Sequence, residues 1–293
     1  MSSSGDDSRG FTVRLFIPSG NPDGVKIVEK SNWTGLGIVL PRSLYKQEKD
    51  RDPLRQGAGV YALFGSEEGD PFPRLYVGEG DPVGPRLDQH YNDDQKSFWT
   101  HAVIFTSKDQ NLNKAHVQYL ESGLITLALR AKRATLKNKN TPQLPSLSEA
   151  DRSEVEGFLA NMLLCFPVLG YQAFEVIEEV LSKTTLLFLK AKNVKGQGYE
   201  SPGGFVVKKG SQAVKKEAPS LERHLKELRQ TLLAREVLVD RGETLELIQD
   251  YSFSSPSMAA GVLLGNSANG RTEWKDKDAR TLKSLQEGDV DRG

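Results

Sequence analysis

The sequence has few of the residues that build disulfide scaffolds, zinc sites or membrane spans. Cys165 is the only cysteine among 293 residues, so no disulfide can form within the chain and a cysteine-ligated zinc site lacks its ligands. It lies in an apolar run, which predicts a small buried side chain rather than a catalytic thiol. The four histidines show no His-Glu-x-x-His spacing, which argues against a zinc hydrolase.

Long apolar segments are also absent from the sequence. A helix needs about 18 apolar residues or more to cross a bilayer, and no run approaches this length. Residues 1–10 are polar and acidic, without the basic start and apolar core of a signal peptide. The sequence therefore predicts a soluble, cytoplasmic protein with no membrane partner. It makes no prediction of the oligomeric state.

Charge is balanced overall but uneven along the chain. Lys and Arg together number 39, as do Asp and Glu, which excludes a uniformly basic nucleic-acid-binding surface. Residues 148–182 carry seven acidic and one basic side chain, whereas residues 183–235 carry twelve basic and four acidic ones. This shift places a domain boundary near residue 182 and predicts a basic C-terminal part.

Turn signals and hydrophobic patterns divide the chain into three parts. Residues 1–53 form a tail and a small β-rich unit, which has too few apolar residues to be stable alone and is expected to pack on the next segment of the chain or to form a small module. Residues 54–182 read as strand–strand–helix–strand–helix, and residues 183–293 as a basic α+β domain. The predicted fold class is therefore α/β (α+β).

The expected elements are inferred from the spacing of apolar residues and from turn and capping residues. Strands are predicted at 11–17, 25–28, 59–64, 74–78, 98–105, 185–191, 204–208 and 244–248. Helices are predicted at 85–91, 112–133, 148–163, 219–235 and 255–264. Asn269-Gly270 predicts a hairpin turn near the C-terminal end.

A carboxylate interrupts the apolar face of the long helix at 112–133. With about 100° per residue, Glu121 falls on the same stripe as Val117, Leu124 and Ala128. A lone carboxylate on a buried face is costly unless it is paired or binds a metal ion. A buried ion pair with Arg or Lys is the simpler explanation, and a metal site is the functional one.

Two further patterns carry chemistry. Arg86 and His90 are four residues apart on the predicted helix, so they share one face and could bind a phosphate; the alternative is an ordinary exposed helical face. Tyr61 and Tyr76 each lie two residues from a glycine, which lets a backbone or a phosphate approach closely. The alternative for each tyrosine is a core aromatic with a satisfied hydroxyl.

The order of these residues resembles the GIY-YIG nuclease family over residues 54–145. The two signature tripeptides are Gly59-Val-Tyr61 and Tyr76-Val-Gly78. They are followed by Arg86 to His90, by Glu121, and by an asparagine that is either Asn138 or Asn140. The resemblance implies a small three-stranded antiparallel sheet flanked by helices, which agrees with the order of elements read from the patterns.

The resemblance also implies an activity, namely divalent-metal-dependent endonucleolytic cleavage of nucleic acid, with DNA as the expected substrate. Glu121 would hold Mg²⁺ or Mn²⁺, and Arg86 would stabilise charge in the transition state. Tyr61 would orient or deprotonate the attacking water, while Tyr76 and His90 would position water or phosphate. Gly59, Gly78 and one asparagine (Asn138 or Asn140) would help to position the substrate. A role in restriction, mobile elements or phage defence is the corresponding biological expectation.

The C-terminal sequence is similar to an uncharacterised domain often joined to such nucleases. The similarity lies in residues 251–260, 266–270 and 273–278. The basic excess of this part predicts nucleic-acid contacts by five residues, namely Lys208, Lys209, Lys215, Lys216 and Trp274. A solvated basic surface on a structural module explains the excess equally well.

Two other functions fit parts of the sequence. A catalytically inactive nucleic-acid-binding or regulatory module would keep the nuclease fold without the reaction. The joint presence of Tyr61, Tyr76, Arg86, His90 and Glu121 argues against this, because decay usually removes one member of such a set. A structural adaptor without nucleic acid is favoured only by the neutral overall charge.

Overall fold

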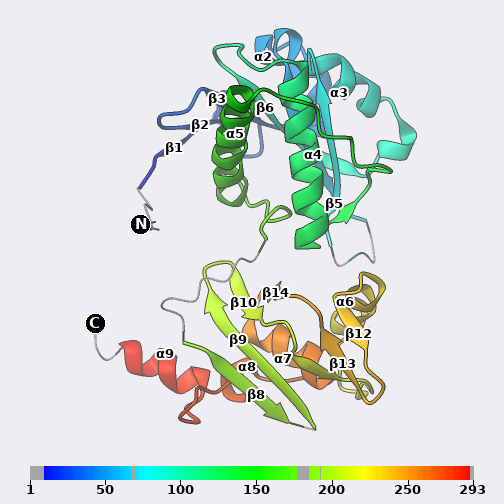
Figure 1. Ribbon diagram of the computed structural model, residues 1–293, viewed down its shortest axis with the longest axis vertical. Coiled ribbons are helices and arrows are strands. Elements are labelled where there is room, and N and C mark those ends of the chain that lie inside the picture. Colours follow the sequence, from blue (N-terminus) through cyan, green and yellow to red (C-terminus); the bar gives the residue numbers. More distant parts are fainter. Residues whose placement is uncertain (1–9, 68–69, 71, 177–184, 192, 291–293) are drawn as a thin grey trace. The chain divides into compact units, whose positions relative to one another are not determined.

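The computed structural model describes residues 10–67, 70, 72–176, 185–191 and 193–290. The chain divides into two compact units, unit 1 at residues 1–176 and unit 2 at residues 177–293. Each is a mixture of helices and strands (Figure 1), so the predicted fold class is confirmed. The boundary expected near residue 182 lies outside the described residues.

Unit 1 is built on a seven-stranded sheet with the order β1-β2-β3-β6-β4-β5-β7. The neighbours pair antiparallel except β5 and β7, which are parallel. Its strands are β1 (Val13–Phe16), β2 (Lys26–Lys30), β3 (Gly35–Pro41), β4 (Gly59–Gly65), β5 (Arg74–Gly80), β6 (Trp99–Ser107) and β7 (Thr135–Leu136). The three strands expected at the centre, β4, β5 and β6, lie next to one another.

The sheet is wider than the three strands that the sequence predicted. The N-terminal segment does not form a separate module, because β3 pairs with β6 along its whole length, from Gly35 opposite Ser107 to Pro41 opposite His101. Both strands are almost entirely buried, so each needs backbone partners on its two edges. Of the two expectations for the N-terminal unit, packing on the next segment of the chain is confirmed, because its strands extend the sheet.

Helices cover both faces of this sheet. The helix α4 (Lys114–Ala131) and the helix α5 (Glu149–Val168) pack on one face, where Leu120 and Leu124 of α4 join the core (Figure 1). The other face holds Leu54 and Leu87, which belong to the shorter helices on that side. These are α1 (Tyr45–Glu48), α2 (Asp52–Gln56) and α3 (Gly84–Tyr91), with 3-10 turns η1 (Arg42–Leu44) and η2 (Asp94–Lys96).

Unit 2 contains two smaller sheets around a buried helix. The strands form one sheet of order β14-β10-β9-β8 and another of order β11-β13-β12. They are β8 (Leu187–Ala191), β9 (Val194–Ser201), β10 (Gly204–Val207), β11 (Gln212–Val214), β12 (Leu238–Asp240), β13 (Thr244–Leu247) and β14 (Tyr251–Phe253). The helices are α6 (Arg223–Ala234), α7 (Pro256–Leu264), α8 (Gly270–Glu273) and α9 (Leu282–Val290). Residues 259–264 of α7 are all buried, which explains why this helix has no polar face.

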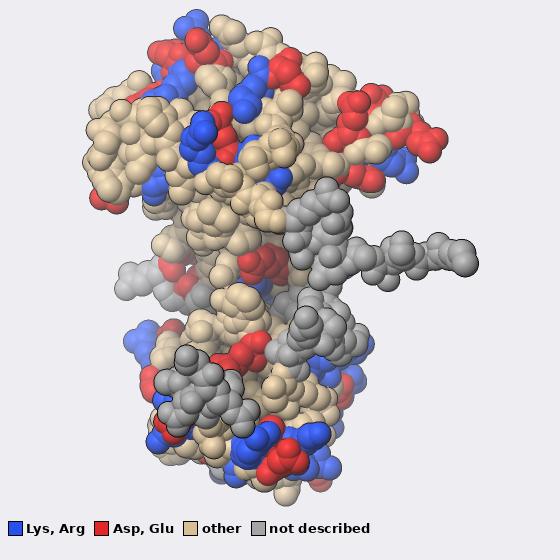
Figure 2. Space-filling view, turned by 90° about the vertical axis from the view of Figure 1, so that its left-hand side faces the viewer, with Lys and Arg blue, Asp and Glu red and all other residues tan. Residues whose placement is uncertain are grey.

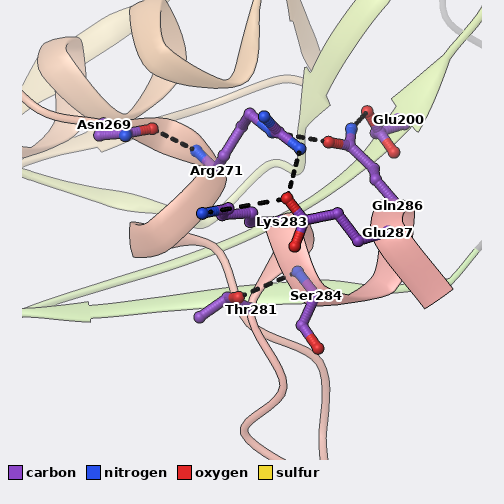
Figure 3. Close-up of polar contacts among 8 residues, drawn as sticks. All are labelled: Glu200, Asn269, Arg271, Thr281, Lys283, Ser284, Gln286 and Glu287. Carbon is purple, nitrogen blue, oxygen red and sulfur yellow. Dashed lines mark hydrogen bonds and ion pairs between the residues drawn. The ribbon is translucent and has the colours of Figure 1, made fainter.

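One turn prediction in unit 2 is wrong. Asn269 does not open a hairpin but caps α8, because its side-chain oxygen accepts a hydrogen bond from the backbone N–H of Arg271 at 3.1 Å. The same amide geometry that favours a tight turn also favours a helix N-cap. Arg271 then reaches Gln286 of α9, and Gln286 donates to Glu200 of β9 (Figure 3). This chain of contacts ties α8, α9 and β9 together.

No described helix of either unit has the length and apolar character needed to cross a membrane. The most deeply buried charge in the described part of unit 2 belongs to Arg229 of α6, whose side chain is 1% exposed. Its guanidinium donates to Glu217 and to the backbone carbonyls of Val214 and Val262. It therefore joins α6 to the Val214 carbonyl of β11 and the Val262 carbonyl of α7 by hydrogen bonds from a buried cation.

Replacing Arg229 by Met should destabilise unit 2 by about 3 kcal/mol, because buried carbonyls and the Glu217 carboxylate lose their partner. Hydrogen exchange of α7 and β11 amides in the full chain measures this locally. Arg223→Met is the control, since the Arg223–Glu227 pair is solvent-exposed and its loss should change stability by less than about 0.5 kcal/mol. Equal protection in the two variants would contradict the assignment.

Candidate functional site

The site begins with a tyrosine that crosses a glycine on the neighbouring strand. Tyr61 of β4 lies directly opposite Gly78 of β5, and its side chain is fully buried. A Cβ atom on Gly78 would overlap the Tyr61 hydroxyl and ring. The glycine is therefore required for the ring to pass over β5. Gly59 is also tightly confined, because a Cβ there would meet the Phe105 carbonyl of β6 at 2.8 Å.

Three of the predicted residues meet at the end of this ring. Tyr61 Oη lies 2.6 Å from Nε2 of His90, which is buried on α3. The Tyr76 ring is centred 4.9 Å from the His90 ring and 6.5 Å from the Tyr61 ring. Leu87, which is fully buried on the same helix, anchors α3 against the sheet. The packing of α3 therefore delivers His90 to the two tyrosines.

Burial sets the protonation states of this cluster. Desolvation raises the pKa of Tyr61 well above its ordinary value of 10.0, and it also raises the pKa of Tyr76. Desolvation, with Lys96 and Arg86 nearby, lowers the pKa of His90 to about 4. Both partners of the Tyr61–His90 hydrogen bond are therefore uncharged at neutral pH. They can orient a polar group without adding charge to the site.

Lys96 is a site residue that the sequence analysis missed. Its Nζ lies 2.8 Å from the centroid of the Tyr76 ring, a cation–π contact. Burial lowers its pKa to about 8, with Arg86 acting in the same direction and Asp93 against it. Arg42 donates to the Lys96 carbonyl at 3.2 Å and so helps to hold this turn. No spacing in the sequence indicates the residue, because it lies on the short turn η2 and not on α3.

Glu121 is the acidic member of the site. It lies on α4 and is half-buried, and desolvation raises the pKa of its carboxyl to about 7. Glu79 on β5 acts in the same direction, while Arg86 and Lys114 oppose it. Glu79 itself is held by Lys114, with Nζ–Oε distances of 2.6 and 2.8 Å. Among the described residues Glu121 has no hydrogen bond or ion pair, so the buried ion pair that was the simpler explanation is not formed.

Arg86 lies at the exposed rim of the same site. Its guanidinium donates to Gln89 at 2.7 Å, and its charge acts on Tyr61, Tyr76 and Glu121. An exposed guanidinium beside the buried Tyr61, the half-buried Tyr76 and a carboxylate can receive an anionic group from solvent. Arg86 therefore completes the set of five residues that the sequence placed together.

The two asparagine candidates differ in their surroundings. The Asn138 side chain accepts from the backbone N–H of Val77 at 2.9 Å and donates to the Val77 carbonyl at 2.7 Å. It replaces a backbone partner at the edge of β5, beside Gly78. Asn140 is exposed. Asn138 is thus the asparagine that the structure attaches to the site strand, and its amide is used to hold that strand.

Glu121 is the residue best able to hold a metal ion. Within the described residues no group of three or more His, Cys, Asp or Glu side chains could hold one. A half-buried carboxylate with no partner nonetheless suits Mg²⁺ or Mn²⁺, since such hard cations bind one or two carboxylates and keep several waters. The residues therefore fit a hydrated hard cation and do not fit a site built wholly from protein ligands.

The five residues of unit 2 that were predicted to contact nucleic acid differ in burial and in ion pairing. The structure contradicts a stacking role for Trp274, because its indole is fully buried, lies 4.6 Å from the Phe205 ring and donates to the Pro256 carbonyl. Lys208 pairs with Asp250 at 3.0 Å, and Lys215 pairs with Asp240 at 2.7 Å. Lys209 and Lys216 are exposed. Figure 2 shows basic and acidic side chains interspersed on one face of each unit.

Comparison with known proteins gives a result for unit 2 alone. Residues 187–286 match the model of a family described as a domain of unknown function, DUF4357. The match falls where the sequence is similar to an uncharacterised C-terminal domain. No curated protein and no solved structure matches the chain.

Replacing Gly78 by Ala should destabilise unit 1 by about 1–3 kcal/mol, because the added methyl group overlaps the Tyr61 side chain. Thermal unfolding of the full chain measures the change. Gly157→Ala is the control, since a Cβ there meets nothing within 4 Å and the residue lies inside α5. That variant should be slightly more stable than the wild type. Equal unfolding midpoints for Gly78→Ala and the wild type would contradict the close approach.

Glu121→Gln should stabilise unit 1 increasingly as the pH rises from 5 to 8 in EDTA. A folded-state pKa of about 7, above the ordinary 4.5, means that the wild type loses stability as the pH rises through this window. Allowing for solvent around the half-buried carboxylate, the gap should widen by about 1–2 kcal/mol. Urea unfolding at both pH values measures it, and a gap independent of pH would refute the raised pKa.

Proposed function

We propose that unit 1 is a divalent-metal-dependent endonuclease of the GIY-YIG kind, which hydrolyses phosphodiester bonds of nucleic acid, with DNA as the expected substrate. The observation that carries the proposal is the convergence of five residues from four separate elements. Tyr61, Tyr76 and His90 are in contact, and the charges of Arg86 and Glu121 act on both tyrosines. Structural packing alone does not require an unpaired carboxylate beside this cluster.

The cationic side of the site suits the phosphate. Arg86 is exposed and can donate two parallel hydrogen bonds to phosphate oxygens. Lys96 adds a second cation next to the Tyr76 ring. Charge that develops on the phosphate oxygens in the transition state would therefore face fixed positive groups in a partly desolvated site. Tyr76, whose ring contacts Lys96 and His90, would donate its hydroxyl to the same oxygens.

The acidic side of the site suits the metal ion. Glu121 would hold Mg²⁺ or Mn²⁺, which when bound would neutralise the phosphate and the leaving oxygen. Lys114 keeps Glu79 engaged, so Glu79 contributes negative field and not a second free carboxylate. Glu121 is then the residue whose carboxylate charge a bound cation would compensate.

The attacking water would be positioned by the tyrosine pair. Because the pKa of Tyr61 is raised well above 10.0, its phenol stays protonated at neutral pH, and it acts by orienting the water and not as the base. The hydrogen bond to His90 fixes the direction of the hydroxyl. Of the roles that the family resemblance implies for Tyr61, orientation is the one that these surroundings favour.

Unit 2 would bind or select the substrate, and a role in restriction, mobile elements or phage defence is consistent with such a pairing. A catalytically inactive module that binds nucleic acid is the alternative. It predicts binding without cleavage, which a single assay can distinguish from the nuclease.

The test is cleavage of supercoiled plasmid, single-stranded DNA and single-stranded RNA by the full chain with Mg²⁺, Mn²⁺ or EDTA. We expect metal-dependent cutting by the wild type and a loss of at least about a hundredfold in Glu121→Gln, because the variant cannot supply a carboxylate ligand. Glu156→Gln is the matched control. Glu156 is a carboxylate of unit 1 that accepts from the Tyr119 hydroxyl, a role that glutamine can keep.

The outcomes separate the hypotheses. Cutting by the wild type and by Glu156→Gln but not by Glu121→Gln supports the nuclease. Binding of DNA without cutting on every substrate supports the inactive module instead. Equal cutting by the wild type and Glu121→Gln would show that the reaction takes place elsewhere or belongs to a contaminant.

A further inference from the structure

A hollow with a basic rim lies beside the edge strand of the larger sheet of unit 2. We call it the β8 hollow. It has a volume of about 510 Å³, which is within the range of small-molecule sites. Its lining consists of Phe188, Lys190, Glu273, Lys275, Asp276, Lys277 and Ala279. None of these residues was among the nucleic-acid contacts that the sequence predicted.

The walls of the β8 hollow are held by backbone and side-chain hydrogen bonds. Phe188 and Lys275 exchange two backbone hydrogen bonds, at 2.6 and 2.9 Å, so the segment after α8 is fastened to β8. Asp276 accepts from the backbone N–H groups of Asp278 and Arg280, at 2.9 and 2.8 Å, and fixes the following turn. The buried Trp274 anchors the segment on its other side. The hollow is therefore preformed.

An aromatic ring and lysines share one face of the hollow. Phe188 and Lys190 are two residues apart on β8, while Leu187 and Leu189 between and before them are buried, so the first pair points outward. Lys275 lies directly across the bridge from Phe188, on the same side. The partly exposed ring of Phe188 is thus flanked by a cation on its own strand and by another across the bridge.

The charge of the hollow is positive. Lys190, Lys275 and Lys277 are exposed, and none makes a side-chain ion pair with a residue that the structure describes. Asp276 is already neutralised by Arg280, whose Nη2 and Nε lie 2.7 and 2.8 Å from its Oδ2. Counting only partners that the structure describes, Glu273 is then the one unpaired carboxylate against three lysines in this lining. An anionic ligand is favoured over a cationic one.

We propose that the β8 hollow binds a nucleotide unit of single-stranded nucleic acid, with a base stacked on Phe188 and the flanking phosphates at Lys190, Lys275 and Lys277. A flat apolar surface beside several cations matches the two parts of a nucleotide, and only an unpaired strand leaves a base free to stack. The choice of nucleic acid over an acidic peptide rests on the proposed nuclease function of unit 1. The site itself does not depend on Glu121.

The test measures binding of a fluorescein-labelled 12-nucleotide oligo-dT to the full chain in EDTA, by anisotropy at several salt concentrations. Changing all three lysines, Lys190, Lys275 and Lys277, to Gln should weaken binding tenfold or more. It should also make the slope of log affinity against log salt shallower by about 2, because three phosphate contacts are lost. Phe188→Ala should weaken binding severalfold with the slope unchanged, and Phe188→Trp should retain it. All these side chains line the surface, so unchanged thermal unfolding serves as the folding check.

A matched variant distinguishes the effect of the hollow lysines from the effect of lowering the net positive charge of unit 2. Changing Arg223, Lys226 and Arg241 to Gln removes the same charge from the same unit, at residues that do not line the hollow and are not among the predicted nucleic-acid contacts. We expect a loss of less than threefold. An equal loss in the two triple variants would overturn the proposal. Equal binding of the labelled oligo-dT alone and of its duplex with oligo-dA would also overturn it.

Two further features of the experiment distinguish this proposal from an acidic-peptide site and from the proposed nuclease function. Competition by poly-glutamate as effective as that by unlabelled oligo-dT would overturn it in favour of an acidic peptide. Because EDTA chelates divalent ions, metal-dependent cleavage is prevented and binding is measured whether or not unit 1 is a nuclease. If the hollow variants lose binding and the wild type does not cut nucleic acid, the binding site is supported and the nuclease function is refuted. If the hollow variants bind normally and the wild type cuts nucleic acid, the nuclease function is supported and the binding site is refuted.

Discussion

The close crossing of Tyr61 over Gly78 is the constraint on which the site depends. It requires β4 and β5 to pair in one register, because a shift of one residue would place Val77 or Glu79 beneath the ring. It requires a glycine at that place, and it brings the hydroxyl to His90 on α3. This one contact therefore constrains both the register of β4 against β5 and the position of α3.

Beside this rigid side of the site lies a carboxylate that has no hydrogen bond or ion pair among the described residues. Glu121 lies between Leu120 and Leu124, whose burial holds α4 on the sheet and offsets the cost of the unpaired group. Glu79 increases that cost and Lys114 only partly relieves it. A protein selected for stability alone would replace Glu121 by an apolar or uncharged residue, so its presence is more readily explained by a ligand than by packing.

The sequence predicted the parts of the fold that depend on local patterns. The strands around Tyr61 and Tyr76 and the helices around His90 and Glu121 are indicated by apolar spacing and turn residues, and the structure confirms them. The pairing of β3 with β6 is non-local and leaves no local pattern. Lys96 was missed for the same reason, since only the tertiary fold brings η2 to Tyr76. The choice between Asn138 and Asn140 likewise depended on which one reaches β5.

The charged residues of unit 2 also show how much the sequence alone leaves undetermined. A count of basic residues treats every lysine alike, but the fold pairs Lys208 with Asp250 and Lys215 with Asp240. The count also says nothing of Trp274, which the fold uses as core. What distinguishes one basic group from another is whether a carboxylate lies within reach, and this is decided by strand edges and turns. A partly exposed aromatic beside lysines that have no ion pair among the described residues is therefore stronger evidence for an anionic ligand than the net charge of the segment that contains them.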